Sequence, residues 1–151
     1  MGETMMHFIK FVMALVLFFA TAQAADARDD KYMLPIKAAL ESTEARAKPD
    51  GSVKFFFGKE AAPQVVSKLG QVTFHGKANT RRSDDVKACN AAFLAALVDF
   101  EKRAKKVGAN AVVNIISYYK NVEMSSPTEF ECHAGAAAHA ILRGDLVKIA
   151  D

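Results

Sequence analysis

The 151-residue sequence has no tryptophan and only two cysteines, four prolines and eight glycines. Two cysteines cannot by themselves complete a structural zinc site, and they are too far apart to form a C-x-x-C pair. So few prolines and glycines exclude a collagen-like or low-complexity chain. Half of the residues are apolar and a quarter are charged, which is typical of one globular domain.

Long runs of one charge sign are also missing. The net charge is only +3, and acidic and basic residues are mixed along the chain. Nucleic-acid-binding surfaces concentrate basic residues, so this balance argues against a nucleic-acid partner. No Ser/His/Asp set or pair of carboxylates stands out by its spacing. The sequence therefore predicts no catalytic residue, cofactor or bound metal.

Residues 1–24 have the features of a secretory signal. Lys10 precedes an apolar run to Ala20, and an A-x-A sequence ends at Ala24. This order predicts export to the periplasm or the medium, with cleavage near Ala24. The apolar run is shorter than the roughly 20 residues of a spanning helix, and the alternative is an inner-membrane anchor formed by residues 8–24. Three methionines are candidate starts: Met1, Met5 and Met6.

The remaining chain divides into a short N-terminal part and a main domain. Residues 25–50 are expected to form a polar, flexible leader (25–31) and a short helix, whose apolar positions recur at helical spacing. Residues 51–151 are expected to form a single α+β domain. Its first half should contain strands at 52–58 and 71–78, separated by a loop over residues 59–70.

The clearest element is a long helix over about residues 84–107. Ser83 is the expected N-cap, acidic residues follow it, and Gly108 is placed to end the helix. The apolar stripe predicted to face the core consists of Val86, Cys89, Phe93, Ala96, Leu97, Phe100, Ala104 and Val107. The basic residues within 101–106 are interpreted as a solvated helix end rather than a binding patch.

Three strands are expected after this helix, at residues 109–119, 128–134 and 136–149, and the last is one strand with a bulge or two short strands. Residues 120–127 are expected to connect the first two. One long helix followed by neighbouring strands predicts an α+β two-layer sandwich, in which the helix packs on a mainly antiparallel sheet.

The stretch TEFECHAG places a cysteine beside a histidine. Alternation along a strand puts Phe130, Cys132 and Ala134 on an apolar side that should face the core. Cys89 lies in the apolar stripe of the helix, which faces the same core. An exported chain with two such cysteines is expected to form a Cys89–Cys132 disulfide.

The other side of that strand carries Glu131 and His133. His133 is interpreted as an ordinary surface histidine. Possible surface or site residues are His133, Glu131 and His75. The alternative is a metal- or thiol-dependent enzyme that uses Cys132 with His133 or His139.

Several segments between Asn79 and Ile149 resemble a family of small exported bacterial proteins. They include SDDVKACNAAFLAAL, EKRAKKVGANAVVNI, SYYKN, SSPTEFECHAG and LRGDLVKI, and SVKFFFG upstream also fits. Members are often labelled "excinuclease ATPase subunit", and the family has no established activity. That label conflicts with this chain, because five residues rather than four separate Gly70 from Gly76, so a phosphate loop is not formed.

GANAVVNI and the cysteine-bearing strand also resemble, more distantly, the core of the outer-membrane lipoprotein that senses stress in the Rcs pathway. The resemblance implies a disulfide-stapled helix-on-sheet module that works through protein contacts. This chain lacks the lipoprotein cysteine and a second cysteine pair. Together, these features predict a non-enzymatic exported module that binds a protein or a cell-envelope component.

Overall fold

A computed structural model describes residues 27–43, 47–81 and 83–150 of the chain. The signal segment expected at 1–24 and the alternative anchor at 8–24 lie outside these residues. Among the described helices, none is both long and apolar enough to cross a membrane.

The longest strands of the sheet are β3 (Val65–Asn79) and β7 (Ala137–Ile149), which pair antiparallel along their whole length. On its other side, β7 pairs near its start with β6 (Glu129–Ala134) and further along with β4 (Ala111–Tyr119). The sheet is completed by β1 (Asp30–Pro35), which pairs with β6, and by β2 (Lys54–Phe57) and β5 (Val122–Met124), which pair with β4. Only the β2–β4 pair is parallel among these described strands.

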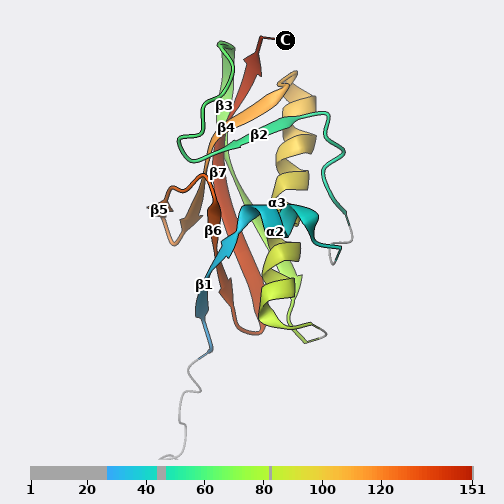
Figure 1. The fold of residues 1–151 in the computed structure, drawn as a ribbon, viewed down its shortest axis with the longest axis vertical. Helices are drawn as coiled ribbons and strands as arrows, with labels where there is room; N and C mark the ends of the chain where they lie inside the picture. Colours follow the sequence, from blue (N-terminus) through green and yellow to red (C-terminus); the bar gives the residue numbers. More distant parts are fainter. Residues whose placement is uncertain (1–26, 44–46, 82, 151) are drawn as a thin grey trace, which may run out of the picture.

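The long helix α3 (Asp85–Val107) packs on one face of this sheet, mainly over β3 and β7 (Figure 1). The fold is therefore the expected α+β sandwich of one long helix on a mainly antiparallel sheet. A second, short helix, α2 (Ile36–Glu41), follows β1 and packs against α3, which it crosses in the view of Figure 1.

The N-terminus of α3 differs in detail from the prediction. Asp84, not Ser83, is the N-cap, and its side chain accepts a hydrogen bond from the backbone N–H of Lys87. Val86 was expected in the core-facing stripe but is 44% exposed, because it lies in the first turn on the solvent side. Gly108 ends the helix with a φ of 78°, as its position predicts.

The core between helix and sheet is built from alternate residues of the strands. Phe93 and Phe100 of α3 are fully buried, and Phe93 stacks on Phe130 of β6 at a centroid distance of 4.2 Å. Along β7, burial alternates with period two, so Leu142 and Leu146 face α3 while Arg143 and Asp145 lie on the opposite, helix-free face. This alternation is what one covered sheet face produces.

Three expectations for the less regular segments are wrong. Residues 30 and 31, assigned to a flexible leader, begin β1, which pairs with β6 over six residues. The expected loop at 59–70 is shorter, because β3 starts at Val65. The short N-terminal helix is confirmed, over Ile36–Glu41. The connection at 120–127, however, contains β5. In each case an edge strand or a short element has too little buried surface to show a clear apolar period.

Candidate functional site

The two cysteines form the expected disulfide between α3 and β6. The sulfurs of Cys89 and Cys132 are bonded at 2.02 Å, and both residues are completely buried in the core. The two bonded cysteines are separated by 43 positions in the sequence. Because both thiols of the sequence are consumed, Cys132 cannot act as a nucleophile or a metal ligand while the bond is intact.

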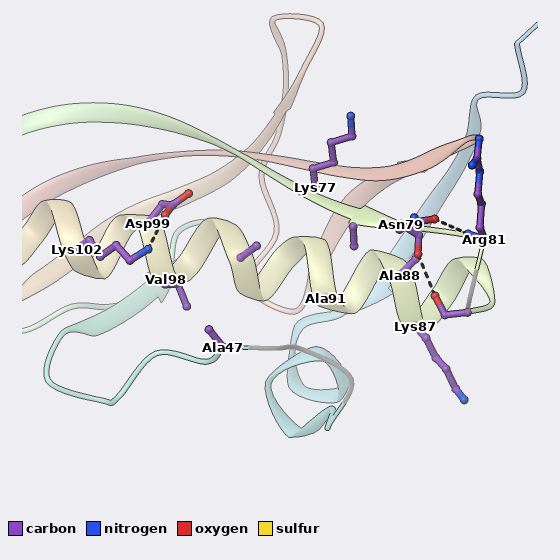
Figure 2. Close-up of a pocket in the computed structure, with 13 residues that line it drawn as sticks. Ala47, Lys77, Asn79, Arg81, Lys87, Ala88, Ala91, Val98, Asp99 and Lys102 are labelled. Carbon is purple, nitrogen blue, oxygen red and sulfur yellow. Dashed lines mark hydrogen bonds and ion pairs between the residues drawn. The ribbon is translucent and has the colours of Figure 1, made fainter.

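A groove of about 860 Å³ runs along the outer side of α3. Its floor is a row of small apolar side chains on α3, Ala91, Ala95 and Val98, which recur at helical spacing and are half-buried. One wall is the end of β3 at Asn79, and the other is the loop at Ala47 (Figure 2). Such small side chains leave room for another backbone to approach the helix closely.

Basic residues stand at both ends of this groove. Arg81 and Lys87 lie at the end near the start of α3, and Lys102 lies at the other. A shallower depression follows there, lined by Phe74, Arg103 and Lys106 among others. Asp99, which is 3.5 Å from the Lys102 ammonium, is the acidic side chain among the described lining residues.

Part of this positive charge is not neutralised by the protein itself. Arg81, Arg103 and Lys106 form no ion pair with another residue in the described part of the chain. Lys77 also lines the groove, but its side chain points away from α3 (Figure 2), so its charge does not face the groove. The rim of the groove is therefore a place where an anionic ligand gains favourable electrostatic energy.

A polar cluster occupies the helix-free face of the sheet, near β1 and β6. The ring nitrogens of His133 lie 3.0 Å from an Asp29 carboxylate oxygen and 2.8 Å from one of Glu131. The ring stacks on Tyr119 at a centroid distance of 3.5 Å. His133 is only 9% exposed, so its interpretation as a surface histidine is wrong. Both contacts are hydrogen bonds donated by the ring when both nitrogens carry a proton.

Lysines complete the charge balance of this cluster. Lys120 contacts Asp29 at 3.0 Å, and Lys31 contacts Glu131 at 2.8 Å. The hydrogen bond from Lys120 lowers the pKa of Asp29 below its usual value. Burial acts to raise the pKa of Glu131, but hydrogen bonds from Lys31 and His133 outweigh it and lower that pKa. The cluster is thus internally satisfied, which is typical of a structural role.

His75 and His139 form a separate pair on the same face. His75 Nε2 lies 2.7 Å from His139 Nδ1, and these rings belong to the neighbouring strands β3 and β7. His133 lies opposite His139 in the β6–β7 ladder. Of the possible site residues predicted from the sequence, Glu131 and His133 are in contact, whereas His75 contacts His139 instead.

Asp29 and Tyr119 were missed as members of the cluster. Asp29 falls in the segment expected to be flexible, and Tyr119 is the last residue of the strand expected at 109–119. No local pattern could have found Asp29, because its contact with His133 spans 104 positions of the chain.

No family model matches this chain, and no curated protein or solved structure matches it at a significant level.

Proposed function

We propose that this protein is an exported, disulfide-stapled module that binds a partner protein and has no catalytic role, and that its groove along α3 receives an extended acidic segment of that partner. The single observation that carries the proposal is the groove, with its small apolar floor between basic ends. The signal-like N-terminus supports export, as does the buried Cys89–Cys132 bond, because such bonds persist in oxidising compartments.

We infer an extended partner segment because one wall of the groove is the end of strand β3. Of the described strands, β3 pairs only with β7, so its other edge offers unpaired backbone groups. An extended peptide can add to such an edge by backbone hydrogen bonds. Small side chains such as Ala91 and Ala95 let it lie close to α3 at the same time.

We infer an acidic partner segment because basic residues lie at the rim of the groove. Arg81, Arg103 and Lys106 would each gain a counter-charge from glutamate or aspartate side chains of the partner. Rim charges mainly raise the association rate and set specificity, and their effect weakens with salt. The thiol-enzyme alternative loses its nucleophile, because Cys132 is bonded to Cys89.

The binding test uses a fluorescein-labelled decapeptide of alternating glutamate and valine, followed by fluorescence anisotropy. We expect saturable binding that weakens as salt is raised. Replacing both Arg103→Gln and Lys106→Gln should weaken it several-fold. The matched control, Lys59→Gln with Lys148→Gln, removes the same charge at exposed sites outside the groove and should leave binding nearly unchanged.

A second pair of variants separates the groove from bulk charge. Ala95→Arg adds a positive charge but fills the floor, so we expect weaker binding. Val86→Arg adds the same charge at an exposed position that does not line the groove and should not weaken binding. Equal loss in both variants, or no binding by the unmodified protein, would overturn the proposal.

Two further measurements address the class of partner and the compartment. Single-stranded DNA of equal charge should bind more weakly than the peptide. Equal affinity would show that the groove binds polyanions in general and does not select a protein segment. The full chain, expressed in a bacterium and fractionated by osmotic shock, should appear in the periplasm without free thiols. Recovery in the cytoplasm with two free thiols would contradict export.

A further inference from the structure

The histidine pair on the helix-free face has a geometry suited to a metal ion. His75 Nε2 and His139 Nδ1 face each other at 2.7 Å, with ring centroids 4.9 Å apart and planes inclined by 44°. Two imidazole nitrogens bound to one ion at about 2.0–2.1 Å would be about 2.9 Å apart at a right angle and about 3.4 Å apart in a tetrahedron. The observed hydrogen-bonded separation is shorter than either value, so the rings must move apart to admit an ion. Imidazole ligands suit copper(II), which stands highest in the general affinity order of the divalent first-row metals.

The scaffold holds these nitrogens together. β3 and β7 pair continuously from Gly70 to Asn79, and the histidines lie diagonally across this ladder. His75 is exposed and His139 is half-buried, so an ion can reach both rings from solvent. Rotation of the two side chains would replace the hydrogen bond between them with a bound metal ion.

The charged neighbours of the histidine pair act on a bound cation in both directions. Lys77 lies opposite His139 in the β3–β7 ladder and works against a bound cation, whereas the negative charge of Asp29 acts on His139 in the opposite sense.

We propose that His75 and His139 form a two-histidine site for copper(II), with solvent in the remaining coordination positions. Among the described residues, no group of three or more histidine, cysteine, aspartate or glutamate side chains is placed to hold a metal ion, so water completes the coordination. His133 is not a ligand, because both of its nitrogens are engaged by Asp29 and Glu131. The site lies on the opposite sheet face from α3 and does not depend on the proposed partner groove.

The test is a titration of the full chain, produced without a histidine tag, with copper(II) alone in a buffer that does not bind metals. We expect one equivalent to bind, with an electron paramagnetic resonance spectrum that shows coordination by imidazole nitrogen. His75→Gln and His139→Gln should each weaken binding by at least about tenfold. Zinc(II) should bind more weakly than copper(II), as the general order of affinities for divalent metals predicts.

Two control variants make the assignment specific. His133→Gln, checked for folding by circular dichroism, should retain the copper site, and Lys77→Gln should bind copper more tightly because a positive neighbour is removed. Copper binding that persists unchanged in both ligand variants would place the ion elsewhere, for example at the chain's amino terminus. Such a result, or a complete absence of binding, would overturn the proposal.

Discussion

Gly76 of β3 lies directly beneath the backbone of Ala92 in α3. A Cβ atom added to Gly76 would come within 1.8 Å of the Ala92 carbonyl oxygen. The helix can therefore approach the strand only because this position lacks a side chain. The contact sets the position of α3 over β3, which forms one wall of the proposed partner groove.

The substitution Gly76→Ala is expected to destabilise the protein by about 2–3 kcal/mol, because backbone atoms must move to relieve the overlap. Gly144→Ala is the matched comparison. Its added Cβ would approach side-chain atoms of Val112 and Ile115, at 2.8 and 3.2 Å, and side chains can adjust. We expect a loss of about 1 kcal/mol there, and urea unfolding of both variants measures the difference. Equal losses would contradict the close backbone contact.

Removing the disulfide should lower the free energy of unfolding substantially. For a closed loop of this size, the chain-entropy model gives a loss of about 4 kcal/mol. The double variant Cys89→Ala with Cys132→Ala tests this by urea unfolding under oxidising conditions. Adding a reductant should destabilise the unmodified protein but leave the double variant unchanged. A reductant-insensitive unmodified protein would show that the bond does not form.

His133 should contribute to stability far more than a surface histidine does. His133→Ala removes a buried ring from Tyr119 and leaves two carboxylates without their donor, so we expect a loss of about 2–3 kcal/mol. Tyr119→Phe keeps the stacked ring and loses only its hydrogen bond to Asp29, which should cost about 1 kcal/mol. If thermal and urea unfolding showed no loss of stability in His133→Ala, the stabilising role of the polar cluster would be contradicted.

The N-terminus of α3 offers a test of which residue caps the helix. Asp84→Ala removes the side chain that accepts from the Lys87 N–H and should cost about 1 kcal/mol. Ser83→Ala leaves this hydrogen bond intact and should change stability by less than about 0.5 kcal/mol. A larger loss of stability in Ser83→Ala than in Asp84→Ala would identify Ser83 as the N-cap.

The polar cluster should make the protein sensitive to acid. The folded-state pKa of Asp29 is lowered, first by its hydrogen bond from Lys120, so below the unfolded value of about 3.9 the unfolded chain binds more protons. The stabilising contribution is therefore complete above that value and is lost as pH falls through the folded pKa. Urea unfolding between neutral pH and about pH 3 should show this loss. In Asp29→Asn, the free energy of unfolding should fall less steeply as the pH is lowered.

The sequence by itself determined the elements whose pattern is local. The repeat of apolar residues along 85–107 specifies α3, and period-two alternation places Cys132 on the core side of its strand. These two patterns are independent, yet both point toward the one interface that a helix on a sheet creates. The disulfide could therefore be predicted without knowledge of the register of the strands.

Only the tertiary structure decided the contacts on the helix-free face and the walls of the groove. β1 is an edge strand with alternately exposed residues, and its charged first residues, Asp30 and Lys31, gave no sign of its pairing with β6. Asp29, Tyr119 and His133 are brought together by pairing between distant segments, which no repeat in the sequence records. Long-range register is set by the summed burial of the whole sheet, so the positions of these polar groups appear only once the chain is folded.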